Sequence, residues 1–308
     1  MKIYKTYLYA FGILAGSLLN ASCVDMLTED PNSYYEKKDI FATKAKAAMA
    51  VTGVYEQLPT LYGSMDMAFP CSDDTYYAAG QTSDKSRRDI AHYKVTSSNT
   101  WVNGVWQGNY TGIERANYTI EGIEGMADYE TDKELQALVG EARFLRALYA
   151  FNLVRYWGDV PFKTTSTNTD KNVFQPRCSR EIIYDQIIED LNFAKTHLPW
   201  ATAATTPEKV TQGAARGLLM RVLLQRAGYS LQMDGSITRP DDAKRRNYFE
   251  AVIEEWEAFK ANGYHDFYPE GYRELFKGFS AGTLNSVESI FEIAFYSPDG
   301  KTGAKGYW

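Results

Sequence analysis

Apolar side chains recur at helical spacing over much of this chain, and the longest such stretch runs from Leu135 to Phe162. Because apolar positions cover most of its circumference, the pattern predicts a long helix buried among other helices. Gly158, with Pro161 three residues later, is a typical helix end. The pattern forms two stripes, one of Leu135, Leu138, Ala142, Leu145, Tyr149 and Asn152/Leu153, the other of Phe144, Leu148 and Phe151.

Three arginines, Arg143, Arg146 and Arg155, interrupt the apolar positions of this stretch. Long basic side chains can lay their aliphatic stems along an apolar surface while the charge stays outside it. We therefore expect these three side chains either to reach solvent or to pair with carboxylates on neighbouring helices.

Five other stretches show the same helical period, at residues 40–62, 101–126, 181–198, 211–228 and 241–262. In the first of these helices the predicted buried face is Ala45, Ala48, Val51, Val54/Tyr55 and Leu58, and Pro59 and Gly63 close it. Ser179 and Thr211 are residue types that cap helices, Asp241 begins the last helix and Gly263 ends it. Along that last helix the apolar positions at helical spacing are Phe249, Val252, Trp256 and Phe259.

Four of these helices form two successive pairs, 135–157 with 181–198 and 211–228 with 241–262. Helix pairs of this length resemble tetratricopeptide-like (TPR-like) repeats, which stack into a superhelix. A short alternating run at 285–295 predicts a strand, and 163–177 and 263–277 are irregular. The sequence therefore predicts a mainly α fold of TPR-like helix pairs forming a superhelical scaffold, with long irregular loops and a few short strands.

Residues 64–100 break the helical pattern with clustered Ser, Thr, Asp and Gly. A polar segment this long within a compact protein is commonly functional or disordered, and rigid scaffolds carry binding groups on such loops. Its aromatic and charged residues have no obvious core to fill, although the tyrosines can also fold back and pack. We expect a ligand-binding site here. Residues of the C-terminal tail could form the opposite wall of this site. The candidates are Asp73, Tyr76, Tyr77, Arg87 and Trp101, and in the tail Tyr296 and Trp308.

The N-terminus has the pattern of an export signal. Lys2 and Lys5 precede an apolar run from Tyr7 to Leu19, which is shorter than the roughly 20 residues that span a bilayer. Small residues then lead to Cys23, and this resembles a bacterial lipobox. We expect residues 1–22 to be a lipoprotein signal peptide and Cys23 to be lipidated; an ordinary secretory signal with an incidental cysteine is the alternative.

Composition narrows the function classes. The formal charge is −6, from 33 basic and 39 acidic side chains, and the absence of a basic cluster argues against a nucleic-acid partner. Three widely spaced cysteines and three histidines form no zinc or iron–sulfur pattern, so no metal or other cofactor is predicted. Cys71 and Cys178 could pair in an oxidising compartment. The 23 Tyr, 15 Phe and 6 Trp either pack between helices or stack on sugar rings.

Two sequence motifs resemble the signature of the SusD/RagB family. The first signature motif runs from Gly140 to Ala147 and the second from Arg155 to Phe162. Trp106, Tyr110 and Ile113 also stand at positions where that family has Trp, Tyr and Ile. The resemblance implies a nutrient-binding lipoprotein on the outer membrane of Bacteroidetes-type bacteria, facing the exterior. It implies an oligosaccharide ligand, passed to a SusC-like TonB-dependent transporter. Family members usually continue beyond the length of this chain, so residues 23–308 resemble the N-terminal part of a SusD-like α-helical domain.

The sequence leaves alternatives to oligosaccharide binding. Some relatives in this family capture peptides, and that alternative stays open. A lipid-anchored glycoside hydrolase needs two carboxylates about 5–10 Å apart, and the sequence singles out no such pair, so we predict no enzyme activity. A helical scaffold without a ligand is a further alternative, against which the long aromatic loops argue.

Overall fold

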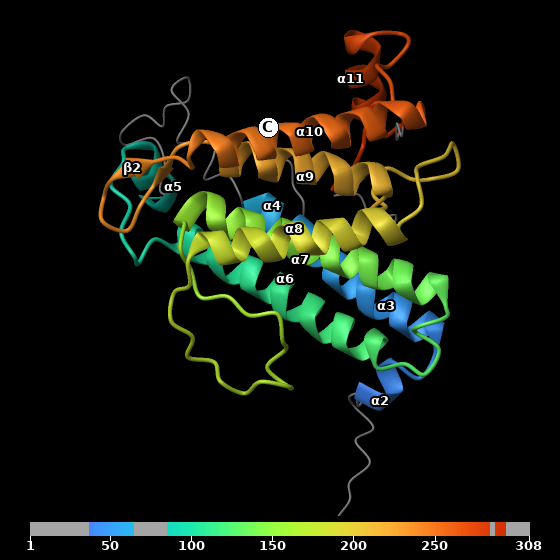
Figure 1. The fold of residues 1–308 in the computed structure, drawn as a ribbon, viewed down its shortest axis with the longest axis horizontal. Helices are drawn as coiled ribbons and strands as arrows, with labels where there is room; N and C mark the ends of the chain where they lie inside the picture. Colours follow the sequence, from blue (N-terminus) through green and yellow to red (C-terminus); the bar gives the residue numbers. More distant parts are fainter. Residues whose placement is uncertain (1–36, 65–84, 284–286, 294–308) are drawn as a thin grey trace, which may run out of the picture. The chain divides into compact units, whose positions relative to one another are not determined.

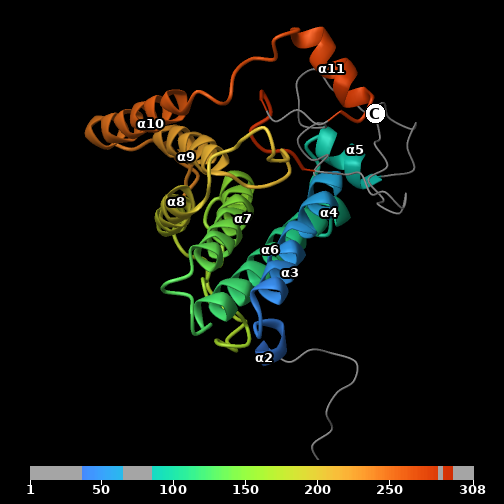
Figure 2. The same ribbon diagram turned by 90° about the vertical axis from the view of Figure 1, so that its right-hand side faces the viewer.

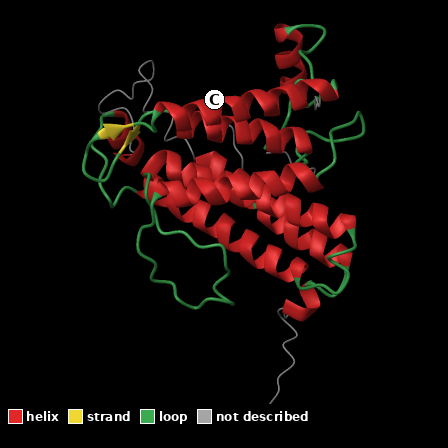
Figure 3. Cartoon of the chain, viewed as in Figure 1, coloured by secondary structure: helices red, strands yellow, loops and turns green. Residues whose placement is uncertain are grey.

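The computed structural model describes residues 37–64, 85–283 and 287–293, which are mainly helical (Figures 1 and 3). The chain divides into two units, residues 1–39 and 40–308, and the architecture below is that of the second. The described elements are, in order, α2 (Lys37–Ile40), α3 (Lys44–Tyr55), α4 (Gln57–Ser64), α5 (Lys85–Ala91), α6 (Thr100–Glu124), α7 (Lys133–Trp157), α8 (Arg180–His197), α9 (Gln212–Ala227), β1 (Ser230–Leu231), β2 (Ile237–Thr238), α10 (Asp242–Asn262) and α11 (Tyr272–Ser280).

Helices α6 to α10 follow one another as antiparallel neighbours, and the chain reverses direction between each and the next (Figure 1). Helix α7 packs on α6 and α8, and α9 packs on α8 and α10. Helices α3 and α4 pack on α6, and α3 also contacts α7, as Figure 2 shows from the side. The predicted fold class, a mainly α scaffold of paired helices, is confirmed.

Local capping chemistry sets most helix boundaries. The predicted caps Ser179, Thr211 and Asp241 each accept a hydrogen bond from a backbone N–H of the first helical turn. Asp132 caps α7 in the same way, accepting from the backbone N–H of Glu134 at 2.8 Å. Gly158 ends α7 at φ 68°, in a conformation that favours glycine. These contacts are local, which explains why the sequence predicted the helix ends so closely.

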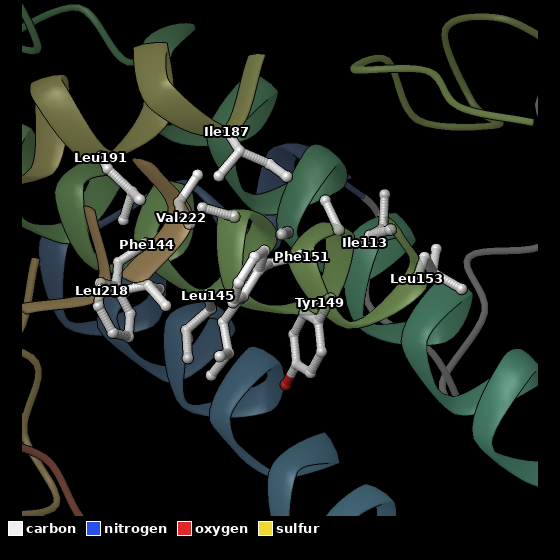
Figure 4. Packing of buried hydrophobic residues seen from close by; sticks show 14 of the residues in the cluster. Ile113, Phe144, Leu145, Tyr149, Phe151, Leu153, Ile187, Leu191, Leu218 and Val222 are labelled. Atoms are coloured by element: carbon white, nitrogen blue, oxygen red, sulfur yellow. The ribbon is translucent and has the colours of Figure 1, made fainter. Parts of the chain in front are cut away.

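Helix α7 forms the centre of the apolar core, as its all-round apolar pattern predicts (Figure 4). Leu145 is completely buried. So is Tyr149, whose hydroxyl donates a hydrogen bond of 2.7 Å to the carbonyl of Val54 in α3. Gly112 of α6 faces this ring so closely that a Cβ there would lie 2.5 Å from it. The close approach of α6 to α7 therefore depends on glycine at this position.

The expectation for residues 40–62 was wrong in two respects. The stretch forms α3 and α4 rather than one helix, and Pro59 lies within α4 instead of ending it. Proline is tolerated there because the first turn of a helix has no intrahelical partner for its N–H groups. The buried face also differs, since Ala45 is exposed and Ala47 is buried. The buried positions are Ala47, Val51, Val54, Leu58 and Leu61.

Three further expectations near the C-terminus need correction. In α10 Trp256 is 48% exposed and the buried residue is Glu255, which pairs with Lys195 and Arg216. The stretch predicted as irregular, 263–277, contains the first part of α11. Residues 287–293, the described part of the predicted strand, form no ladder with the described residues; the hairpin β1–β2, which the sequence analysis missed, is the only strand pair among them.

Candidate ligand-binding face

The second signature motif, residues 155–162, lies at one end of the helices and joins several elements there. Gly158 lies so close to Arg180 that a Cβ would be 2.6 Å from its guanidinium. Asp159 accepts hydrogen bonds from both the backbone N–H and Nε of Arg180, at 3.1 and 3.0 Å. Arg180 in turn donates to the carbonyl of Leu231 in β1 at 2.6 Å. This motif therefore joins the end of α7, the start of α8 and the β1–β2 hairpin, and these contacts are structural.

The first signature motif, residues 140–147, contributes one side of a buried ion pair. Arg146 of α7 donates from Nε and Nη2 to the two carboxylate oxygens of Asp190 in α8, at 2.8 and 2.7 Å. Its Nη1 donates to Asn117 at 2.9 Å and to the carbonyl of Thr164 at 3.2 Å. Both charged side chains are almost fully buried, at 3% and 1% exposure. The guanidinium is therefore satisfied by structural partners, which leaves it no free group for a ligand.

Glu141 of the same motif is also held by contacts within the scaffold. Its carboxylate accepts a 2.7 Å hydrogen bond from the hydroxyl of Tyr55 and forms a 2.8 Å ion pair with Lys209. Burial, and secondarily the Glu141 carboxylate, raises the pKa of the Tyr55 phenol well above its ordinary value. The phenol accordingly stays protonated as a donor. The signature thus holds α3, α7 and the loop before α9 together.

The other two arginines of α7 behave as expected. Arg143 pairs with Glu124 at 2.9 Å and lies 4.3 Å from the centre of the Phe193 ring. Arg155 is exposed, with its guanidinium 5.4 Å from the centre of the Tyr156 ring. Neither side chain is unsupported, since each contacts an aromatic ring.

The long loop between α7 and α8 is fastened to α6. Glu121 accepts hydrogen bonds from the backbone N–H and hydroxyl of Ser166 and from the hydroxyl of Thr169, each at 2.7 Å. Glu114 accepts two from Thr167, at 2.8 and 2.6 Å. A backbone bridge between Val160 and Cys178 closes the base of the loop. These bonds give the scaffold a fixed surface on this side.

Half-buried aromatic rings gather where α6 begins and α7 ends. We call Trp106, Tyr110, Tyr156 and Trp157 the aromatic cluster. Trp106 lies 4.9 Å from Tyr110 and 5.2 Å from Trp157 between ring centres, and Trp157 lies 5.7 Å from Tyr156. The Tyr110 hydroxyl donates to the carbonyl of Pro161 at 2.6 Å, and burial raises the pKa of Tyr110 above its ordinary value. The cluster braces the end of the scaffold that carries α5 (Figure 1).

Trp101 is the one predicted ligand residue whose side chain the structure describes. It lies in the first turn of α6, is half-buried and packs against the core beside the aromatic cluster. Its backbone is held by Asn99, whose side-chain oxygen accepts from the N–H of Trp101 at 3.1 Å and whose amide donates to the carbonyl of Ser86 at 2.9 Å. Trp101 is thus fixed in place and only partly available to a ligand.

The remaining predicted residues are not tested. Cys23, Asp73, Tyr76, Tyr77, Tyr296 and Trp308 lie outside the described residues, and Arg87 belongs to α5 but its side chain is not described. Cys71 also lies outside them, so pairing with Cys178 stays open; the Cys178 thiol donates to the carbonyl of Val160 at 3.3 Å.

Tyr93 is the feature of this end that sequence reasoning missed. It follows α5 with φ 56°, the one described non-glycine residue in the left-handed region, and its side chain is 79% exposed. Two backbone bonds hold it, from its own N–H to Ile90 and from Lys94 to Asp89. A non-glycine residue at positive φ carries a conformational cost and often marks a functional position. No sequence pattern predicts this angle, although Tyr93 lies within the segment expected to bind.

This arrangement offers surfaces on which a ligand could stack. Flat exposed and half-exposed rings offer stacking surfaces, and Arg88 and His92 on and beside α5 add polar groups. Across residues 37–64, 85–283 and 287–293 no three His, Cys, Asp or Glu side chains are grouped to hold a metal ion. None of the described helices has the length and apolar composition to cross a bilayer.

The fold defines a protein built of successive antiparallel helix pairs. The chain belongs to the SusD-like family, because the family model described as "Starch-binding associating with outer membrane" matches residues 25–224. A SusD-like protein, P25, of Formosa agariphila is 24% identical over 224 residues, which are 68% of this chain and 40% of that protein. A SusD-like protein of Bacteroides ovatus is 28% identical over 139 residues, which are 45% of this chain and 25% of that protein.

Solved structures agree with the family. A SusD homologue from Bacteroides thetaiotaomicron is 26% identical with a TM-score of 0.71, matching 87% of this chain and 50% of its own. A structure with xylogluco-oligosaccharide matches 83% of this chain and 47% of its own at 23% identity, with a TM-score of 0.65, which shows the shared fold. The chain thus spans about half the length, or less, of these relatives.

Proposed function

We propose that this protein is a cell-surface lipoprotein that binds oligosaccharides and delivers them to a SusC-like TonB-dependent transporter in the outer membrane. Its family is described as starch-binding and associated with the outer membrane, and one protein of the same fold was solved with an oligosaccharide. In this proposal the chain binds and does not catalyse.

The observation that carries the proposal is Tyr93. An exposed ring at a strained backbone position, 79% accessible and held by its own backbone bonds, presents a ready surface for the apolar face of a sugar. Trp101, at the start of the helix to which α5 is tied, supplies a second ring. Because hydrogen bonds already hold the backbone at both residues, little backbone entropy is lost on binding.

Calorimetric titration of an oligosaccharide panel, with malto-, xylogluco- and peptide ligands, tests this site. Tyr93→Ala should lower the affinity for the preferred oligosaccharide at least about tenfold, or about 1.4 kcal/mol, whereas Tyr93→Phe should retain most of it. The matched control is Tyr272→Ala, which removes a tyrosine of nearly equal exposure, 77%, from α11. Equal affinities for Tyr93→Ala and the control would refute the role of Tyr93, and binding of peptides alone would replace the ligand class.

Residues 73–101 complete the site in this proposal, with Asp73, Tyr76, Tyr77 and Arg87 as further contacts and Tyr296 and Trp308 opposite them. The double variant Tyr76→Ala/Tyr77→Ala should lose binding while its melting curve stays unchanged. If stability falls and the folded fraction binds as before, these tyrosines are structural. Affinities of micromolar to millimolar, about 4–8 kcal/mol, would suit a protein that releases its cargo.

Lipid attachment at Cys23 anchors the protein in this proposal. Metabolic labelling with a fatty-acid analogue should mark the wild-type protein, and Cys23→Ala should abolish the label. Equal labelling of both would remove the anchor from the account. Delivery predicts that the tagged protein copurifies with a TonB-dependent barrel from outer membranes, and repeated isolation without one would count against the transfer step.

A further inference from the structure

A cleft of about 520 Å³ opens among α4, α7, α9 and the segment 287–293. Phe144 and Leu148 of α7 and Leu218 of α9 line it, and Figure 4 shows Phe144 and Leu218 facing one another across the two helices. Ile290, Phe291 and Ile293 form another side, held in part by a hydrogen bond from Glu292 N–H to the carbonyl of Pro207. This volume lies within the range of small-molecule sites, and the lining is largely apolar.

Small residues of α9 leave this space open. Ala214 and Gly217 both border the cleft, and a Cβ built on Gly217 meets no atom within 4 Å. Glycine within a helix is less favourable than alanine. No positive φ or close backbone approach accounts for Gly217, in contrast to Gly112 and Gly158, where a neighbouring ring or guanidinium excludes a Cβ. Room for an occupant is the structural consequence of glycine at this position.

One turn beyond Gly217, Arg221 borders the cleft with an exposed side chain. Among the described residues Arg221 has no carboxylate partner, whereas Arg216 and Arg226 of the same helix each form ion pairs. Tyr62 also lines the cleft. The cleft thus combines an apolar floor with a positive charge at its edge that pairs with no carboxylate among the described residues.

We propose that this cleft binds a small aliphatic carboxylate of the fatty-acid class, with the chain on Phe144, Leu148 and Leu218 and the carboxylate on Arg221. Charge complementarity favours this occupant, because an apolar cleft with one unpaired guanidinium matches a ligand with an apolar body and one anionic end. Each methylene buried should raise affinity about fourfold, since burial of a CH₂ contributes about 0.8 kcal/mol. This inference is independent of the oligosaccharide site.

Calorimetry of the full chain with hexanoate, octanoate and decanoate tests the proposal. Affinity should rise about fifteenfold for each two methylenes, from the fourfold increment above. The wild type should bind decanol more weakly than decanoate. The Arg221→Gln variant should bind decanol and decanoate equally. Gly217→Leu should block decanoate while leaving the melting temperature unchanged or higher, because a Cβ at this position meets no atom within 4 Å and leucine favours a helix. The matched control, Arg246→Gln, removes an exposed arginine of α10 and should bind like the wild type.

Three outcomes would overturn the proposal. These are affinity that does not depend on chain length, decanoate binding that survives both Arg221→Gln and Gly217→Leu, and no saturable binding at all. In the last case a dimer in sedimentation velocity that Gly217→Leu dissolves would identify a second copy of the chain as the occupant. Tyr93→Ala should bind decanoate normally, so failure of this proposal and failure of the oligosaccharide site remain distinguishable.

Discussion

The buried pair of Arg146 and Asp190 offers the most direct test of how the family signature stabilises this fold. Asp190→Ala removes the carboxylate that accepts two hydrogen bonds from Arg146, at 2.8 and 2.7 Å, and a third from Gln186 at 3.2 Å, and it leaves a guanidinium with 3% exposure without its counter-ion. Breaking such a pair from one side costs about 3–5 kcal/mol in the free energy of unfolding. Arg146→Met should also destabilise the fold, because it leaves the Asp190 carboxylate buried with Arg143, at 3.8 Å, as its remaining cation among the described residues, and it frees the side-chain oxygen of Asn117 and the carbonyl of Thr164.

Urea denaturation of the two single variants and the double variant measures the coupling. In Arg146→Met/Asp190→Ala no buried charge is left unpaired, so the double variant should be no less stable than either single variant, and the interaction energy should be at least about 2 kcal/mol. Exposed pairs provide the control, and Lys277→Ala at the Glu274 pair should change stability by less than about 1 kcal/mol. Additive losses in the cycle, or single losses below 1 kcal/mol, would refute the reasoning.

Three further outcomes follow from the described core. Leu145→Ala should lower the free energy of unfolding by about 2–5 kcal/mol because the side chain is fully buried; a loss under about half a kcal/mol would place α7 outside the core. Gly112→Ala should cost about 1–3 kcal/mol, measured in urea, because its Cβ would overlap the Tyr149 ring. Burial raises the pKa of Tyr184 to about 12, so the folded state keeps the neutral phenol after the unfolded chain has ionised, near pH 10. Stability should therefore be intact below pH 10 and fall from pH 10 to 12, and Tyr184→Phe should flatten that fall in urea titrations.

The sequence alone predicted the features that depend on neighbours along the chain. The caps at Ser179, Thr211 and Asp241 act within one helical turn, and the apolar circumference of α7 announced its burial. The resemblance of residues 140–162 to the SusD/RagB signature is confirmed by the family match to residues 25–224. The site residues were expected on a loop of which the structure describes only the end, so those assignments stay proposals.

Tertiary structure decided which apolar positions are buried and which polar groups meet. Arg146 and Asp190 are 44 residues apart, and only the packing of α7 on α8 brings them together. Trp256 has the same spacing as a core residue but is exposed, because the described elements pack on the other face of α10, where Glu255 meets Lys195 and Arg216. The positive φ of Tyr93 likewise comes from the backbone bonds that end α5. Periodicity specifies that a helix has an apolar face, whereas the neighbours available in three dimensions determine whether that face is covered.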